Sequence, residues 1–231
     1  MDISGSVALV TGANRGIGRR FAAQLLERGA KKVYATARNP ELVDLPGVEA
    51  LRLDITDPAS VADAAAVAQD VTLLINNAGI ATYTNLVEGD LEKIRQEMDT
   101  HFYGTLNVVR AFAPVLGANG GGAMLNVLSA LSWFSYDGAN AYSAAKAAEW
   151  SLTNGVRLEL RAQGTLVTGL HLGAAATDMM AGYEGDMNDP SDVARAALDG
   201  IEAGRIEVVV DEWSRTVKAS LAADPSLFYA A

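Results

Sequence analysis

The sequence predicts a doubly wound α/β fold, in which a mostly parallel, seven-stranded sheet carries helices on both faces. Short apolar runs alternate along the chain with longer segments of helical period, as in repeated βαβ units. The apolar runs are nearly continuous in Val, Ile and Leu, which is typical of strands covered on both faces. The chain has 231 residues, 50% of them hydrophobic, which is enough for one sizeable core.

The apolar runs and the capping signals give the expected elements in order. Seven buried strands are predicted at 7–10, 32–36, 50–53, 72–75, 123–128, 166–170 and 206–210. Asp57-Pro58 and Asp189-Pro190 each place a capping carboxylate before a proline at the first helical position, and Gly29 ends a helix. Helices are predicted at 15–28, 58–69, 90–117, 140–163, 190–203 and 212–223. No repeat or linker divides the chain, so we expect a single domain over 1–231.

The charge and composition exclude several functions. The chain has 28 acidic and 18 basic side chains, a net charge of −10 and a pI near 4.6, which oppose general binding to nucleic acid or anionic membranes. Because there is no cysteine and only two histidines, disulfides, thiolate or His-rich metal sites and Cys nucleophiles are excluded. No metal site is expected.

One uncharged stretch, 111–136, is long enough to cross the roughly 30 Å hydrocarbon layer of a membrane. Pro114, Gly117 and the glycines at 120–122 break it, so we expect a helix end, a loop and a strand there. The N-terminal residues lack a basic segment followed by an apolar one, and no secretory signal is predicted. A soluble, cytoplasmic protein is therefore expected.

A glycine-rich segment at 11–18, TGANRGIG, follows the first predicted strand and opens the first helix. Glycines let the backbone turn sharply and approach a pyrophosphate, whose charge then lies at the positive end of the helix. The glycine spacing differs from the common dinucleotide fingerprint, so a plain strand-to-helix connection is the alternative. The expected nucleotide contacts are Gly12, Asn14, Arg15, Gly16, Ile17 and Gly18.

The charges near this turn favour NADP(H) over NAD(H). An NAD site normally offers Asp or Glu about 20 residues beyond the last glycine, to hold the ribose 2′-hydroxyl. Ala37 and Arg38 stand there instead, and Arg15 is a cation in the first helical turn, where it opposes the helix dipole unless an anion is near. A 2′-phosphate between Arg15 and Arg38 supplies that anion. The alternative is that both arginines are solvated surface charges.

Tyr142 and Lys146 are four residues apart within a predicted helix, so their side chains share a face. A phenol has a pKa of about 10, and lowering it by about 2 to 3 units takes about 3 to 4 kcal/mol. An ammonium about 4 Å away supplies about that much at an effective dielectric constant of about 20. The pair is thus a candidate general acid, although the spacing alone also fits an amphipathic helix surface.

Three further motifs lie where predicted strands end. Ser129 follows the fifth strand, the segment 76–79 (NNAG) ends the fourth, and Asp54 ends the third, where its carboxylate can accept from an adenine amino group. Open α/β sheets bind ligands at the carboxyl ends of their strands. We therefore expect these motifs and Tyr142 to meet in one crevice.

The combination and order of TGANRGIG, NNAG, Ser129 and YSAAK resembles the short-chain dehydrogenase/reductase family over essentially the whole chain, which implies a Rossmann-type fold. The resemblance implies that the glycine turn cradles the pyrophosphate and that Asp54 and Ile55 bracket the adenine. It implies that Ser129 binds the substrate oxygen, that Tyr142 exchanges the proton, and that Lys146 binds the nicotinamide ribose while lowering the pKa of the tyrosine. Further cofactor or sheet contacts implied are Asn76, Ala78, Gly79, Gly173, Ala175 and Thr177.

The chain departs from the family pattern at two places. Family members carry an Asn-x-x-Gly whose asparagine holds a proton-relaying water, whereas this chain has His101 and Gly104. His101 is either an alternative relay residue or a packed histidine that fills the site. After the sixth strand, Leu172-Gly173 stands where the family has Pro-Gly, so the loop that carries Thr177 is expected to be less rigid.

A short substrate loop is expected at about 174–189. It contains Met179, Met180, Tyr183 and Met187, and methionines adapt to irregular apolar surfaces, so we expect a hydrophobic substrate. Four aromatic residues are either pocket wall, core or subunit contacts: Tyr83, Trp133, Phe134 and Tyr136. The resemblance also implies a homodimer or homotetramer, formed through the helices at 90–117 and 140–163.

These observations predict an NADP(H)-dependent oxidoreductase that interconverts a small-molecule ketone or aldehyde and an alcohol by hydride transfer. Two alternatives stay open. One is an NAD-linked alcohol dehydrogenase, and the other is a non-catalytic NADP(H)-binding sensor or scaffold that keeps the fold without the chemistry.

Overall fold

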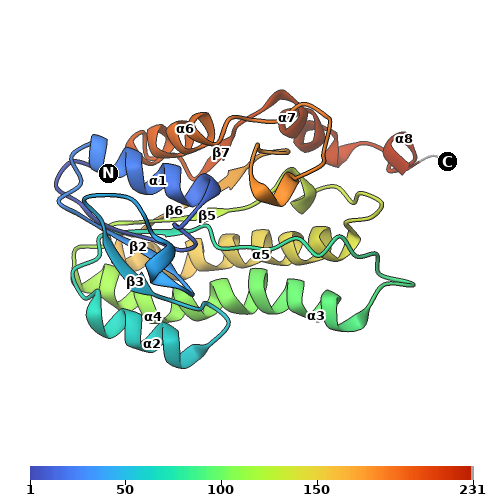
Figure 1. Cartoon of the computed structure of the whole chain (residues 1–231). Helices are drawn as coiled ribbons and strands as arrows, with labels where there is room; N and C mark the ends of the chain where they lie inside the picture. The colour runs from blue at the N-terminus through green and yellow to red at the C-terminus, as the bar shows by residue number, and fades with distance from the viewer. Residues whose placement is uncertain (230–231) are drawn as a thin grey trace.

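The computed structural model describes residues 1–229, which form a seven-stranded parallel sheet between two layers of helices (Figure 1). The strand order is β3-β2-β1-β4-β5-β6-β7, and each neighbouring pair is parallel. This confirms the predicted fold class. The strands are β1 (Val7–Val10), β2 (Lys32–Ala37), β3 (Glu49–Arg52), β4 (Leu73–Asn76), β5 (Ala123–Val127), β6 (Leu166–His171) and β7 (Glu207–Val209).

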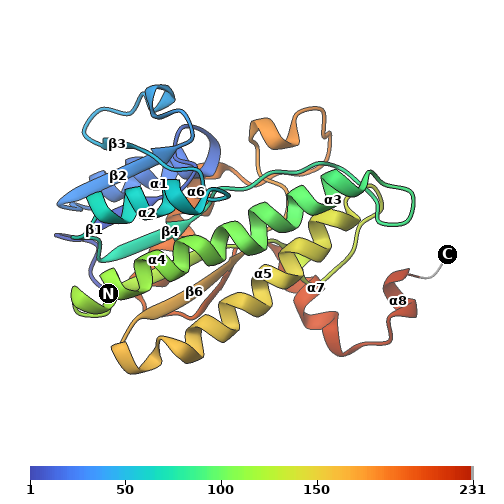
Figure 2. The ribbon, with the colours of Figure 1, turned by 90° about the horizontal axis from the view of Figure 1, so that it is seen from below.

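Helices cover both faces of the sheet. In Figure 1 the layer above the sheet holds α1, α6 and α7, and the layer below holds α2, α4 and α5. Figure 2 shows the lower layer from outside, with α3 lying beside α5. The helices are α1 (Gly16–Glu27), α2 (Pro58–Val67), α3 (Leu91–Met98), α4 (Thr105–Ala118), α5 (Asn140–Glu159), α6 (Pro190–Glu202), α7 (Glu212–Ala219) and α8 (Ser226–Tyr229).

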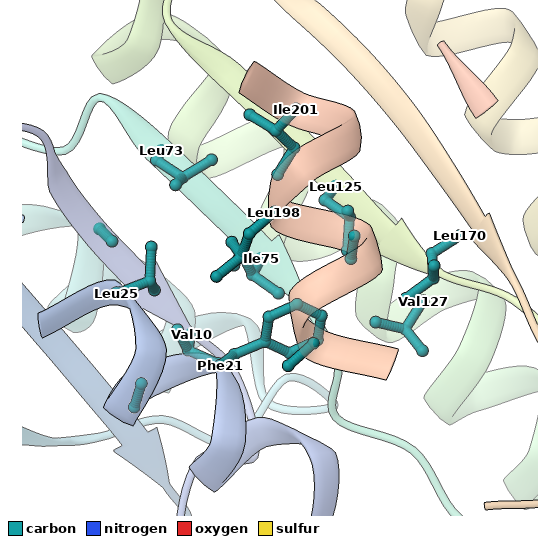
Figure 3. Packing of buried hydrophobic residues seen from close by; sticks show 14 of the residues in the cluster. Val10, Phe21, Leu25, Leu73, Ile75, Leu125, Val127, Leu170, Leu198 and Ile201 are labelled. Atoms are coloured by element: carbon teal, nitrogen blue, oxygen red, sulfur yellow. The ribbon is translucent and has the colours of Figure 1, made fainter. Parts of the chain in front are cut away.

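The two faces of the sheet carry separate hydrophobic clusters because successive residues of a strand point to opposite faces. Ala8 and Val10 of β1 face α1 and α6, whereas Val7 and Leu9 face the layer with α2, α4 and α5. Figure 3 shows Phe21 of α1 packed among strand and α6 side chains, and it is fully buried. Burial of each such large apolar side chain stabilises the fold by about 1.5 to 3 kcal/mol.

The crevice predicted from the strand order lies at the carboxyl ends of β1 and β4. From β1 the chain moves outward through β2 to β3, then returns to β4 on the other side of β1 and continues outward to β7. The connections after β1 and β4 therefore leave the sheet in opposite directions, which opens a crevice between them.

Several predicted elements differ from the structure. The helix predicted at 212–223 ends at Ala219 before a 3₁₀ turn, and β7, predicted to be buried, is an edge strand with Ile206 exposed. Strand β3 is an edge strand with exposed side chains, including Glu49 and Arg52, so the prediction of a buried strand is wrong there. The helix predicted at 90–117 is divided by a π-helical turn, Asp99–Gly104, between α3 and α4. The helix predicted at 140–163 ends at Glu159, followed by a short 3₁₀ turn and Gly164 in the left-handed region at φ 75°.

Candidate active site

The glycine-rich turn between β1 and α1 has little room for a side chain at any of its three glycines. Gly12 and Gly16 have φ values of 66° and 54°, which favour glycine. A Cβ on Gly18 would lie 2.2 Å from the carbonyl oxygen of Gly12. Asn77 fixes the turn from β4, because its side-chain amide donates to the carbonyl oxygens of Thr11 and Gly12 at 2.9 and 3.2 Å.

A cavity of about 1730 Å³ lies at the carboxyl ends of the strands and contains most of the predicted site. Small-ligand sites usually measure about 300 to 1,000 Å³, so there is room for a dinucleotide and a second molecule. Gly18 and Asn76 do not line the cavity; the amide of Asn76 donates to the side chain of Asn126 at 2.8 Å inside the sheet. The predicted residues that line it are Gly12, Asn14, Arg15, Gly16, Ile17, Arg38, Asp54, Ile55, Ala78, Gly79, His101, Ser129, Tyr142, Lys146, Gly173, Ala175 and Thr177.

The three predicted catalytic side chains lie together on one wall of this cavity. Ser129 follows β5 and begins a short 3₁₀ turn, and its hydroxyl accepts from the backbone N–H of Leu131 at 3.1 Å. Tyr142 and Lys146 lie on the same face of α5, with the Lys146 Nζ 5.8 Å from the centre of the Tyr142 ring. Lys146 is 4% exposed. Its ammonium donates to the Val127 carbonyl oxygen at 2.8 Å and to the Glu149 carboxylate at 2.7 Å.

Burial raises the pKa of Tyr142 above its ordinary value. The Lys146 ammonium lowers it, as predicted, and the Ser129 hydroxyl does so too, but by less than burial raises it. The net direction is therefore opposite to the predicted one, because the spacing of Tyr142 and Lys146 reveals neither burial nor an opposing charge. The Glu149 carboxylate offsets part of the ammonium's influence and raises the pKa of Tyr142 further.

His101 lies in the π-helical turn and is 1% exposed. Its ring meets the Tyr142 ring edge to face, with the ring centres 5.2 Å apart. Its Nε2 is 3.0 Å from the Ile80 carbonyl oxygen and 3.3 Å from the Glu97 carboxylate. The histidine therefore fills the site, as the packing alternative predicts, and contacts ionisable groups, as the relay alternative requires.

The two arginines expected near a 2′-phosphate have different surroundings. Arg15 pairs with Asp178 of the substrate loop at 3.1 Å, and both side chains are exposed. Arg38 is exposed and forms no ion pair within residues 1–229. Exposed ion pairs contribute about 0 to 1 kcal/mol, so the pairing of Arg15 is easily exchanged for a bound phosphate.

Backbone hydrogen bonds join the two ends of the substrate loop, and the Arg15–Asp178 ion pair links the loop to the glycine-rich turn. Backbone hydrogen bonds link Ala176 to Asn188 and Asn188 to Ala174, at 3.0 and 2.8 Å. The Asp211 carboxylate accepts from the Gly173 N–H at 2.7 Å and from the Asn188 amide at 3.0 Å. An acid at the start of α7 therefore holds the residue that follows Leu172, where the family has proline. Met179, Met180, Tyr183 and Met187 all line the cavity, as does Trp213, which sequence reasoning missed.

The four candidate aromatic residues divide into two pairs. Tyr83 and Tyr136 line the cavity. Trp133 instead stacks on His171, with ring centres 3.7 Å apart, and Phe134 stacks on Tyr229 of α8 at 5.1 Å. Trp133 and Phe134 therefore do not line the cavity, and their stacking supports the segment that follows Ser129.

His171 is a buried neutral histidine behind Ser129, the predicted catalytic serine. Its Nδ1 lies 3.1 Å from the Ser129 carbonyl oxygen, and burial lowers the pKa of His171 to about 4. A histidine whose pKa is lower in the folded than in the unfolded state stabilises the fold above pH of about 6.5, and this contribution is lost as the pH falls towards 4.

We expect the wild-type protein to lose about 2 kcal/mol more free energy of unfolding between pH 7 and pH 5 than a His171→Asn variant. Asparagine keeps a donor for the Ser129 carbonyl oxygen but does not titrate. Urea unfolding at the two pH values measures the difference. Equal losses in the two proteins would contradict a buried, neutral His171.

Sequence reasoning also missed two buried acids, one beside Lys146 and one beside His101. Glu149 is 2% exposed and Glu97 is fully buried. Both carried a signal in the sequence, because Glu149 is three residues after Lys146 and Glu97 is four residues before His101, which are same-face spacings on a helix. Asp211 carried no comparable signal, because its partners are distant in the sequence.

Comparison with known proteins places this site in a family. The model for short chain dehydrogenases matches residues 6–188. The chain belongs to the short-chain dehydrogenase family. It is accordingly an oxidoreductase, and a relative from Staphylococcus aureus that is named an uncharacterised oxidoreductase is 29% identical over 85% of this chain and 90% of the relative.

Two further similar proteins are named with a cofactor. A short chain dehydrogenase from Burkholderia cenocepacia, solved in complex with NADP, is 39% identical, covers 100% of this chain and 98% of its own, and superposes with a TM-score of 0.95. The NADPH-dependent 1-acyldihydroxyacetone phosphate reductase of Schizosaccharomyces pombe is 33% identical over 78% of this chain and 64% of the relative. Within residues 1–229, no helix of this short-chain dehydrogenase is both long and apolar enough to span a membrane.

Proposed function

We propose that this protein is an NADP(H)-dependent reductase that interconverts a ketone or aldehyde and an alcohol. One observation carries the proposal: Ser129, Tyr142 and Lys146 line the same cavity as the glycine-rich turn. A hydroxyl, a phenol and an ammonium beside a nucleotide-binding turn are the groups that polarise and protonate a carbonyl oxygen during hydride transfer.

The residues at the turn fit a dinucleotide. A Cβ on Gly12 would lie 3.0 Å from the Ala78 Cα, so only glycine leaves the backbone bare at this point. No side chain caps the N-terminus of α1, so its N–H groups are available to pyrophosphate oxygens. Arg38 and Arg15 supply positive charge for the 2′-phosphate, and two relatives named with NADP or NADPH support this choice.

In carbonyl reduction the bound nicotinamide supplies the hydride. Ser129 donates a hydrogen bond to the carbonyl oxygen, and Tyr142 donates a second one and then gives its proton to the alkoxide. Lys146 has three N–H donors, of which Val127 and Glu149 use two. The third is available to a ribose hydroxyl, and the positive charge stabilises the phenolate that Tyr142 becomes.

We propose that the substrate is an uncharged, hydrophobic carbonyl compound. Met179, Met180 and Met187 line the cavity and adapt to apolar shapes, and Tyr183 adds an aromatic wall. Asp137, Asp178, Asp186 and Glu212 also line it, which disfavours an anionic substrate.

A substrate panel followed by NADPH absorbance tests this function. The panel contains aromatic and medium-chain ketones and aldehydes, the matching alcohols, and 1-acyldihydroxyacetone phosphate as the anionic case. We expect the uncharged aromatic carbonyls to be reduced with the highest kcat/KM. Tight NADPH binding without turnover of any compound would instead favour the sensor or scaffold alternative.

Replacing Arg38 with alanine is expected to raise the KM for NADPH by about 10- to 100-fold, because a hydrogen bond between charged groups contributes about 1.5 to 3 kcal/mol. The KM for NADH, which lacks the 2′-phosphate, should stay nearly constant. Steady-state kinetics with both cofactors measures the two constants. A wild-type preference for NADH would point to the NAD-linked alcohol dehydrogenase.

We also propose a homodimer or homotetramer that uses the outer faces of α4 and α5. Leu158 on α5 is 70% exposed, and Tyr103, in the turn that leads into α4, is 54% exposed. Large apolar groups exposed on one layer are typical of a protein interface. Light scattering after size-exclusion chromatography gives the mass, and a monomer would contradict the proposal.

A further inference from the structure

Two buried carboxylates, one next to Lys146 and one next to His101, have no part in the chemistry proposed above. Glu149 is held from two sides: one carboxylate oxygen accepts from Lys146 at 2.7 Å, and the other accepts from the Thr105 hydroxyl at 2.8 Å. Glu97 is fully buried one helix away and accepts from the backbone N–H of Thr82. Carboxylates are almost never fully buried unless they are paired, so both need a partner of opposite charge or a proton.

His101 lies between these two acids. Its Nε2 is 3.3 Å from a Glu97 oxygen, and its Nδ1 is 3.9 Å from the Glu149 oxygen that binds Lys146. Among the described residues, 1–229, Nδ1 has no hydrogen-bond partner although it is buried. Lys146, Glu149, His101 and Glu97 are therefore four ionisable groups in contact or nearly so, and we call them the acid–imidazole cluster.

His101 lies in a rare type of backbone turn that is frequent at functional sites. The chain forms a π-helical turn at Asp99–Gly104, between the α-helices α3 and α4. Such turns are rare and occur frequently at functional sites. The ring also needs a glycine at position 79, because a Cβ on Gly79 would lie 2.7 Å from the His101 Cε1. His101 also lines the cavity, so water there can reach the ring.

The charges of the cluster require an exchangeable proton. Two carboxylates and one ammonium leave one negative charge without a partner among side chains that are nearly fully buried. Such a charge is costly, and a proton shared among His101 and the carboxylates neutralises it. The other ionisable group facing the His101 ring is Tyr142 on α5.

We propose that Glu97, His101 and Glu149 hold and deliver the proton that restores Lys146, and through it Tyr142, after each carbonyl reduction. This rests on the proposed function. Tyr142 gives its proton to the alkoxide oxygen, and the Lys146 ammonium gives one to the phenolate. Glu149 takes a proton from His101 Nδ1 and passes it to the amine. His101 then regains a proton from solvent through a water molecule in the cavity, which gives up one proton and receives another. One proton enters for each hydroxyl formed, and no group in the cluster is oxidised or reduced.

The cluster can be tested first without cofactor. The chain has two histidines, so ¹⁵N-histidine NMR resolves the His101 ring, with His171→Asn to assign it. We expect Glu149→Gln and Glu97→Gln to change the His101 ring-nitrogen signals. Glu159→Gln, an exposed acid at the end of the same helix α5, is the control and should leave them unchanged. Glu149→Gln should also lower the pKa of Tyr142, measured by phenolate absorbance against a Tyr142→Phe reference, because the Glu149 carboxylate raises it.

The second test follows NADPH oxidation with 1-phenyl-1,2-propanedione as the carbonyl probe. In His101→Ala the phenol is already protonated, so the first turnover should stay fast while later turnovers slow by about 10- to 100-fold. Added imidazole should restore part of the steady-state rate. Pyrazole, a ring of the same size that is a much weaker base, should not. If His101→Ala does not fold, His101→Gln should give the same burst followed by slow turnover.

The outcomes separate this proposal from the function on which it rests. Equal restoration by imidazole and pyrazole, or wild-type steady-state turnover in His101→Gln, would show that His101 only fills space. Unchanged His101 signals and an unchanged Tyr142 pKa in Glu149→Gln would likewise overturn the cluster. Wild-type protein that reduces no carbonyl would refute the proposed function alone, and the cofactor-free measurements would still decide the coupling of Glu149, His101 and Tyr142.

Discussion

Replacing Tyr142 with phenylalanine is expected to lower carbonyl reduction by about 10²- to 10⁴-fold, the usual contribution of a positioned general acid. In the proposed reaction the phenol gives a proton to the developing alkoxide, and the variant keeps the ring but lacks the hydroxyl. The affinity for NADPH, measured by quenching of protein fluorescence, should change little, because the glycine-rich turn and both arginines are untouched.

Tyr103→Phe is the matched control for this substitution. Tyr103 is exposed and lies outside the cavity, so loss of its hydroxyl should leave turnover unaltered. Retained activity in Tyr142→Phe would remove Tyr142 from the acid role. Equal losses in both variants would mean that the effect is a general one on folding.

Replacing Lys146 with methionine should cost both activity and stability. The variant leaves Glu149 buried without its ammonium, and removing one partner of a buried pair lowers the free energy of unfolding by about 3 to 5 kcal/mol. Turnover should fall by at least about 100-fold, because the positive charge that stabilises the phenolate is gone. Urea unfolding and NADPH oxidation measure the two effects.

The double variant Lys146→Met and Glu149→Met separates stability from catalysis. It removes the uncompensated carboxylate together with the ammonium, so most of the lost stability should return while turnover stays low. A double variant as unstable as the single one would show that the ammonium contributes through its bond to the Val127 carbonyl oxygen instead.

Much of the fold was predictable because the parallel strands are buried on both faces and therefore stand out as apolar runs. Strand β3 was located but its burial was wrong, because an apolar run does not reveal that a strand lies at the edge of a sheet. The π-helical turn at Asp99–Gly104 was not predictable, because it replaces a helical turn without a breaker residue such as proline. Its place depends on tertiary contacts, such as that of Gly104 with Ile55.

The candidate site was predictable where its residues follow directly from strands, as Ser129 and Gly79 do. The electrostatics were not, because they depend on groups brought in from other elements. Glu97 contacts His101 from the preceding helical turn. Glu149 forms an ion pair with Lys146, so the ammonium is not isolated. Without these distances, the sequence gives the wrong direction for the pKa of Tyr142.

The contact between Phe134 and the end of the chain has a practical consequence for protein production. Phe134 is five residues beyond Ser129, its ring packs on Tyr229, and the Tyr229 hydroxyl accepts from the Ser135 N–H at 2.9 Å. A truncation before Tyr229 therefore removes the support of the segment that follows Ser129. Variants made for kinetic work are best kept unchanged at least as far as Tyr229.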